Sequence, residues 1–363
     1  MEFKKSDFIA FSADAGRAIA NLEMAHSQWT DSRRELSAMP VSMYWQTKEG
    51  QDYLAVKQHS NDSGTTVGVR SPALEAQLLN FTEKKDALKA RIAVTDPLIR
   101  DRAAQYRALR LPALPDRQAE ILRKLDVEGL LGYDLLVVGT NAFAAYELAC
   151  QAKFPVMNET SEATEVFDFA WCQNTRVSLA ATAPTRSLEK RRSLFSVLRS
   201  IDSTYRINPK KPYQAVNDAG YEVELLAAPS THPLPNGSGF DPMASLTEQE
   251  WLLCGQPLAC VVATVRMRSC PLYVPDPRWM ALHKLWLSRK PKRDRNKKPK
   301  DERQGHVLLD ATRYFLADSH PLDIDFVLGL PDELRDIFNS WAAERNFDPI
   351  DSARRSLNFP RSP

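Results

Sequence analysis

The sequence has few cysteines, and no two of them are spaced as a C-x-x-C pair. An odd number of cysteines without such a pair indicates neither a disulfide framework nor a common zinc site, so we expect buried, reduced thiols. The five cysteines are Cys150, Cys172, Cys254, Cys260 and Cys270.

The sequence also lacks an internal repeat and any apolar run long enough to span a bilayer. Residues 1–7 are charged and lead into no apolar stretch, so they do not look like a secretory signal. We therefore expect a soluble, cytoplasmic protein without a membrane partner. The formal net charge of +2 is close to balance, so the overall charge neither favours nor excludes binding to nucleic acid.

At 363 residues the chain is long enough for two or three domains. Apolar residues at helical spacing predict helices over about 6–38 and 72–110, and Pro97 is expected to break or restart the second. Pro112 and Pro115 form a short rigid link at the expected domain boundary. The expected parts are an N-terminal helical region with a small β-hairpin or meander (1–115), a mixed α+β core (116–270) and a C-terminal helical region (271–363).

Residues 135–147 are typical of a buried strand, a tight turn at Gly139 and the start of a helix. A helix start offers unpaired backbone N–H groups, and Gly139 lets a ligand approach the backbone. The Thr140 hydroxyl can cap the helix or contact a phosphate. The turn is therefore a candidate phosphate site, although many α/β proteins contain such a turn with nothing bound.

Two later segments place acids on predicted strands. Residues 164–171 predict a strand in which Asp168 shares a face with apolar side chains. A buried carboxylate there needs a partner, a metal ion or a helix N-terminus, and the alternative is an exposed edge or a cap. Glu222 and Glu224 share one face of a strand in a predicted hairpin over 214–226, where simple exposure to solvent is the alternative.

A basic segment lies near the C-terminal end of the sequence. Residues 289–300 contain eight Lys or Arg and one acid, which predicts a mobile, solvated loop between two helices. Contact with an acidic acceptor such as tRNA is the alternative interpretation.

The order of these features, a Gly-Thr turn followed by two acidic strands, resembles the nucleotidyltransferase-fold superfamily. There a G-[GST] turn holds nucleotide phosphates, a D-x-D strand binds metal, and a later strand supplies a third carboxylate. More narrowly, the chain looks like a bacterial group of nucleotidyltransferase-like proteins with a helical N-terminal part, over about residues 70–320. The motifs that carry the resemblance are V-V-G-T-N-A-F-A-A-Y-E (137–147), A-T-E-V-F-D (163–168), G-Y-E-V-E-L (220–225), P-R-W-M-A-L-H-K-L (277–285) and K-D-E-R-Q (300–304).

The resemblance implies an α/β fold of the mixed α+β kind, with a nucleotidyltransferase-type mixed sheet flanked by helices. It also implies binding of an NTP and of Mg²⁺ or Mn²⁺. Asp168 and Glu224 would be the catalytic, metal-binding acids. In distantly similar toxin–antitoxin nucleotidyltransferases a lysine of a K-L helix contacts the triphosphate, and Lys284 is the matching position. The implied nucleotide-binding residues are Gly139, Thr140, Asn141 and Lys284.

One departure from the family pattern affects the expected activity. The first acid of D-x-D is replaced by Val166, and Glu165 should face the opposite side of the strand. Because oxygen-ligand metal sites depend on carboxylate count, catalysis is expected to be impaired or absent unless Glu222 supplies the missing ligand. The resemblance as a whole makes nucleotidyl transfer to a protein or RNA hydroxyl the first hypothesis. Its rivals are a degenerate nucleotide-binding or protein-interaction module and an RNA-binding protein that uses residues 289–300.

Overall fold

The computed structural model describes residues 1–363 except 60–61, 133, 156–175, 182–193, 232–246 and 351–363. It is a mixed α+β structure in which several sheets are flanked by helices, as the sequence predicts. A hydrophobic core extends from the first long helix through the sheets to the last helix. None of the helices within the described ranges combines the length and the hydropathy needed to cross a membrane.

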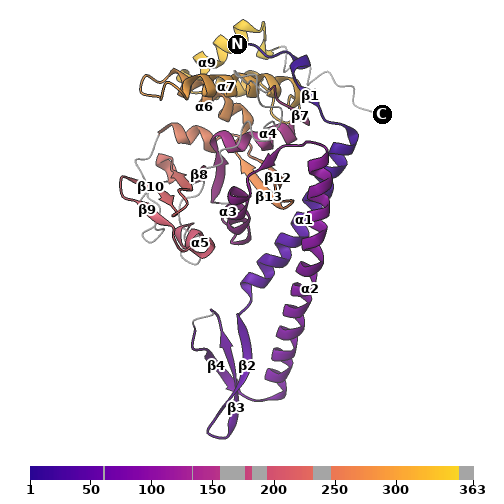
Figure 1. Ribbon diagram of the computed structural model, residues 1–363. Coiled ribbons are helices and arrows are strands. Elements are labelled where there is room, and N and C mark those ends of the chain that lie inside the picture. Colours follow the sequence, from indigo (N-terminus) through magenta and orange to yellow (C-terminus); the bar gives the residue numbers. More distant parts are fainter. Residues whose placement is uncertain (60–61, 133, 156–175, 182–193, 232–246, 351–363) are drawn as a thin grey trace.

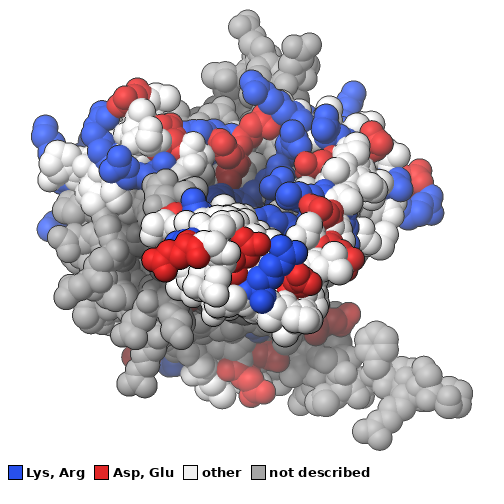
Figure 2. All heavy atoms as spheres, turned by 90° about the horizontal axis from the view of Figure 1, so that it is seen from below, with Lys and Arg blue, Asp and Glu red and all other residues white. Residues whose placement is uncertain are grey.

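The N-terminal region contains two long helices, α1 (Ala13–Ala38) and α2 (Pro72–Ala108), which pack against each other as an arm. Figure 1 shows this arm reaching away from the rest of the molecule, with a small sheet at its far end. Basic and acidic side chains are interspersed over this end, which points toward the viewer in Figure 2. The sheet is antiparallel in the order β2 (Ser42–Lys48), β3 (Gln51–Lys57) and β4 (Thr65–Val69).

The predicted break at Pro97 is wrong, because α2 continues through this residue. A proline inside a helix removes one backbone hydrogen bond. The buried face of α2 nevertheless extends on both sides of Pro97, from Leu88 to Tyr106. Packing of this long face against its neighbours stabilises the helix more than one lost hydrogen bond weakens it.

A five-stranded mixed sheet lies at the centre of the molecule. Strand β8 is antiparallel to β6 on one side and parallel to β11 on the other, and β10 forms an antiparallel hairpin with β11 as predicted. The strands in spatial order are β6 (Leu135–Val138), β8 (Arg176–Ala181), β11 (Glu222–Leu226), β10 (Lys211–Val216) and β9 (Arg206–Asn208).

The register of this sheet brings the two ends of the candidate site to the same level. Ser178 of β8 is the register partner of both Val138 on β6 and Glu224 on β11. Two strand spacings separate β6 from β11, which is roughly 10 Å. Val138, the residue before the Gly139 turn, and the candidate acid Glu224 therefore lie at the same level of the sheet, with β8 between them.

Two smaller sheets and several short helices complete the core. Strand β12 (Leu258–Thr264) pairs antiparallel with β13 (Ser269–Val274) and parallel with β5 (Ala113–Leu114). Strand β1 (Ile9–Ala10) pairs with β7 (Ala152–Lys153), which ties the N-terminus to the core. The remaining elements are the α-helices α3 (Asp116–Val127), α4 (Phe143–Ala149) and α5 (Leu194–Ile201) and the 3₁₀ helices η1 (Lys5–Asp7), η2 (Gly139–Ala142), η5 (Pro229–Thr231) and η6 (Thr247–Leu253).

The C-terminal helices cover the end of the molecule opposite the arm (Figure 1). The helices α6 (Pro277–Arg289) and α7 (Lys298–Phe315) pack closely at Gly305. An added Cβ at Gly305 would lie 2.5 Å from Leu285 Cγ and 2.8 Å from the Ala281 carbonyl oxygen. The basic segment expected over 289–300 is shorter in the structure, because its first residue and its last three belong to the flanking helices. These helices are α6 (Pro277–Arg289), α7 (Lys298–Phe315), α8 (Ile324–Leu328) and α9 (Asp332–Glu344).

Candidate functional site

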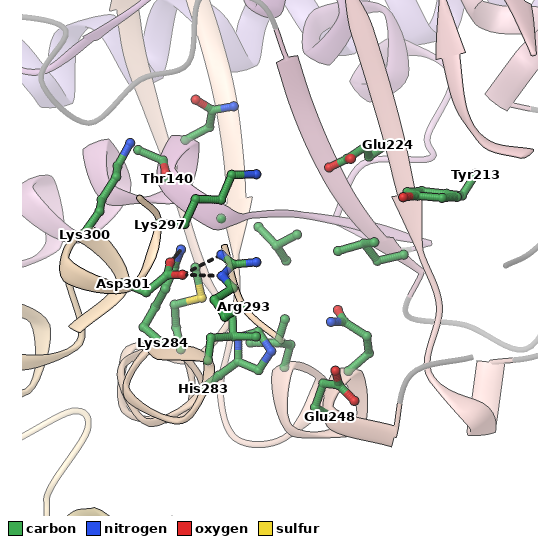
Figure 3. Close-up of a pocket in the computed structure, with 18 of the residues that line it drawn as sticks. Thr140, Tyr213, Glu224, Glu248, His283, Lys284, Arg293, Lys297, Lys300 and Asp301 are labelled. Carbon is green, nitrogen blue, oxygen red and sulfur yellow. Dashed lines mark hydrogen bonds and ion pairs between the residues drawn. The ribbon is translucent and has the colours of Figure 1, made fainter. Parts of the chain in front are cut away.

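A cavity of about 610 Å³ lies beside the central sheet, where β6 ends. Its walls come from η2, β10, β11, η6, α6, α7 and the connection between α6 and α7. Figure 3 shows Thr140 and Lys300 on one side and Glu224 and Tyr213 on the other, with Lys297 between them. In the described part of the chain, the charged side chains of the lining are basic at Lys211, Lys284, Arg293, Lys297 and Lys300 and acidic at Glu224, Glu248 and Asp301. The cavity therefore favours an anionic ligand.

The turn after β6 has the backbone conformation that glycine favours. Gly139 has a φ of +76°, and an added Cβ there would meet no atom within 4 Å. The chain then forms the short 3₁₀ helix η2 before α4 begins at Phe143, whereas the sequence predicted an α-helix directly after the turn. Thr140 and Asn141 line the cavity. Gln304 on α7 donates a long hydrogen bond from Nε2 to Thr140 Oγ1, at 3.5 Å.

Glu224 presents an oriented carboxylate to the same cavity. Gln214, its register partner on β10, donates from Nε2 to Glu224 Oε1 at 2.6 Å. Asn208 Nδ2 on β9 donates in turn to Gln214 Oε1 at 3.2 Å. Because Gln214 is fully buried, this chain of amides holds the carboxylate in one orientation.

Two cations meet one buried acid at the base of α7. Asp301 accepts from Lys284 Nζ at 2.8 Å through Oδ1 and from Arg293 Nε at 2.7 Å through Oδ2. Burial lowers the pKa of Lys284, and the adjacent Asp301 opposes this effect by favouring the charged ammonium. A single carboxylate thus faces two positive groups, which leaves an excess of positive charge at this wall.

The structure brings most of the predicted site residues together in this cavity. Glu222 shares a face of β11 with Glu224 but does not line the cavity. Asp168 and the rest of the expected acidic strand lie outside the described residues. The predicted residues that line the cavity are Gly139, Thr140, Asn141, Glu224 and Lys284.

Other lining residues had no clear signal in the sequence. Asp301 falls within the K-D-E-R-Q motif, where an acid at the start of a helix next to a basic segment could have suggested an ion-pairing role. His283 falls within the H-K-L motif, where the resemblance singled out only its neighbour Lys284 as a nucleotide-binding residue. Gln249 carried no recognisable pattern, because an amide on a short 3₁₀ helix has no characteristic spacing.

The donor set in the described part of the chain gives partial support to a divalent metal. Glu224 is an oxygen ligand of the kind that Mg²⁺ and Mn²⁺ prefer. Within the described ranges, however, no group of three His, Cys, Asp or Glu side chains is arranged to hold a metal ion. Glu224 can therefore supply one ligand, and a complete site requires others.

Comparisons with known proteins identify the family. Searches of curated proteins and of solved structures gave no significant match. The family model described as "Nucleotidyltransferase" matches residues 116–323, more than half of the chain. The matched region contains the Gly139 turn, β11, α6 and α7, which form most of the cavity walls. The chain therefore belongs to this nucleotidyltransferase family.

Proposed function

We propose that the cavity binds an NTP together with Mg²⁺ or Mn²⁺, and that the protein transfers a nucleotidyl group to a hydroxyl of a protein or an RNA such as tRNA, in the cytoplasm. The observation that supports this proposal most is that distant parts of the sequence meet at one cavity. The Gly139 turn, the Glu224 carboxylate and a group of cations come from distant parts of the sequence and face one cavity within the matched family region.

In this proposal, the triphosphate lies between the Gly139 turn and the cationic wall. The turn offers backbone N–H groups and the Thr140 hydroxyl as donors. Lys297 and Lys300 reach the cavity from the start of α7, and Lys284 and Arg293 share the single acid Asp301. The phosphates can therefore pair with positive charge that Asp301 does not neutralise.

The proposed metal ligands are Glu224 and Asp168, with Glu222 as a further candidate. Gln214 would keep the Glu224 carboxylate aimed into the cavity. A bound divalent cation supplies charge neutralisation at the phosphates and aligns the reacting oxygens. The replacement of the first D-x-D acid by Val166 leaves fewer carboxylates than the family pattern has, so we expect slower transfer than a complete set would give.

The proposed division into residues 1–115, 116–270 and 271–363 gains support from the start of the family match at residue 116. The match continues to residue 323, into the proposed C-terminal region. Because α6 and α7 form part of the cavity, we propose that the core and these two helices act as one catalytic unit, with the arm attached to it.

The test is transfer of label from α-³²P NTPs to an acceptor in cell extract, with Mg²⁺ or Mn²⁺. We expect a labelled protein or RNA, distinguished by protease and ribonuclease treatment, and loss of label in both Asp168→Asn and Glu224→Gln. Asp218→Asn is the matched control, since Asp218 lies on the same hairpin, is exposed, pairs with Arg206 and does not line the cavity. Undiminished labelling by Glu224→Gln would contradict the proposal.

A second candidate is a degenerate module that binds nucleotide without turnover, which Val166 favours. The same experiment separates the two. Binding of an NTP measured by calorimetry, without label on any acceptor from extract, would establish the module and reject the transferase.

A further inference from the structure

Two side chains of the cavity remain unused by the proposed transfer. His283 on α6 and Gln249 on η6 both line it, with only 5% and 4% of their surfaces exposed. Within the part of the chain that the structure describes, neither ring nitrogen of His283 has a hydrogen-bond partner, and neither does Gln249 Oε1. Buried polar atoms are rarely left unpaired, because burial removes the water that would satisfy them. Because these unpaired atoms line a cavity, a bound molecule could hydrogen-bond to them.

His283 is held in place by aromatic packing instead of hydrogen bonds. Its ring stacks on Trp286, with centroids 6.2 Å apart and an interplanar angle of 24°. The edge of Trp251 packs at 6.4 Å, and Trp286 is itself fixed by a 2.8 Å hydrogen bond from Nε1 to Glu333. The imidazole is thus positioned while both nitrogens stay available.

The His283 ring is neutral at physiological pH. Burial, followed by the nearby Lys284 charge, lowers the pKa of His283 to about 3. A neutral imidazole has one N–H donor and one nitrogen acceptor. Together with the carbonyl oxygen of Gln249, the site offers one donor and two acceptors without a formal charge.

This chemistry differs from that of the phosphate side of the cavity. A phosphate oxygen cannot donate to the Gln249 carbonyl or to the imidazole acceptor, whereas the edge of a nucleobase carries N–H groups and acceptors in one plane. Figure 3 shows His283 and Glu248, the neighbour of Gln249, on the opposite side of the cavity from Thr140. A volume of about 610 Å³ is within the range of small-molecule sites and accommodates both ends of a nucleotide.

We propose that His283 and Gln249 form a nucleobase-recognition subsite, so that the protein selects among NTPs by hydrogen bonds to the base edge. This inference rests on the proposed function, because it takes the triphosphate to lie at the Gly139 turn. The two residues read the base, and the turn and cations hold the phosphates.

The test compares binding of ATP, GTP, CTP, UTP and inorganic tripolyphosphate by calorimetry in Mg²⁺. Wild type is expected to bind its preferred NTP at least about tenfold more tightly than tripolyphosphate, which corresponds to roughly one or two buried hydrogen bonds. His283→Phe keeps the ring stack but removes both nitrogens, and Gln249→Met keeps the side-chain length. Each should weaken the preferred NTP by about tenfold, reduce the differences among the four NTPs and leave tripolyphosphate unchanged.

Two further variants guard against a purely structural effect. Gln118→Met is the matched control, because Gln118 is fully buried with both amide atoms unpaired but does not line the cavity, so NTP binding should not change. His283→Gln restores a hydrogen-bonding group and should recover part of the lost selectivity. If thermal unfolding shows that His283→Phe is not folded, the binding measurements on Gln249→Met alone test the subsite.

The outcomes separate the inference from the proposed function. Wild-type affinity for all four NTPs in Gln249→Met and in a folded His283→Phe would overturn the subsite while leaving triphosphate binding intact. So would wild-type protein that binds tripolyphosphate as tightly as every NTP, or variants that weaken tripolyphosphate equally. Wild-type protein that binds neither tripolyphosphate nor any NTP would reject both proposals.

Discussion

Replacement of Gly305 by alanine tests whether the close approach of α6 and α7 builds the cavity. An added Cβ at this position would lie 2.5 Å from Leu285 Cγ and 2.8 Å from the Ala281 carbonyl oxygen. The Leu285 side chain can move, but the carbonyl belongs to the backbone of α6, so the helices themselves must separate. Alanine in place of glycine favours a helix by about 1 kcal/mol, and overpacking of a core costs about 1–3 kcal/mol. We expect these effects to combine so that Gly305→Ala lowers the free energy of unfolding by up to about 2 kcal/mol.

Gly16 on α1 provides the matched control, because it is also a helical glycine but an added Cβ there would meet no atom within 4 Å. Gly16→Ala should therefore raise the free energy of unfolding by about 0.5–1 kcal/mol. Urea denaturation followed by circular dichroism measures both variants.

The same change should reach the candidate site. Asp301 lies one helical turn before Gly305 on α7, so separation of the helices would lengthen its 2.8 Å contact with Lys284. NTP affinity should fall in Gly305→Ala and stay unchanged in Gly16→Ala. A Gly305→Ala protein stabilised as much as Gly16→Ala would refute the close packing of α6 and α7, because no overpacking cost would then oppose the gain from alanine.

Two further predictions concern acidity and nucleic acid. Burial, then the N-terminal ammonium and Arg345, lower the pKa of His306 to about 4, so the unfolded chain binds a proton between pH 6.5 and about 4 that the folded chain does not. The free energy of unfolding should fall by up to about 1.4 kcal/mol for each unit by which the pH is lowered in this window, and His306→Gln should remove that part of the slope in urea titrations at several pH values. The connection between α6 and α7 can be tested as a contact to an RNA acceptor. Replacing the exposed Lys292 and Lys297 by glutamine should then reduce the slope of log affinity for RNA against log salt concentration by about 1.4. The same replacement of Lys84 and Lys89 on the arm should leave this slope unchanged. Arg293 is left unchanged in this test because Asp301 already holds it, and an equal slope in both double variants would exclude this contact.

Much of the local structure followed from short-range patterns. The apolar run before Gly139, the turn itself and the hairpin that carries Glu224 all formed near the predicted residues. Each depends on chain-local chemistry, such as alternation of side chains along a strand or the positive φ that glycine tolerates. The predicted break at Pro97 failed for the opposite reason, since burial of α2 on both sides of Pro97, from Leu88 to Tyr106, is a tertiary effect that outweighs the local preference of proline.

The sequence by itself determined the strand before Gly139, the glycine turn and the hairpin that carries Glu224, and which family motifs surround them. Tertiary structure decided that Glu224 lies across β8 from that turn, that Asp301 joins Lys284 and Arg293, and that His283 and Gln249 face the same cavity. These outcomes depend on pairing between residues far apart in the chain, where strand register and helix packing fix the partners. Charge and hydropathy along the sequence indicate that a buried ion or amide needs a hydrogen-bonding or ionic partner. They do not indicate which distant residue is that partner.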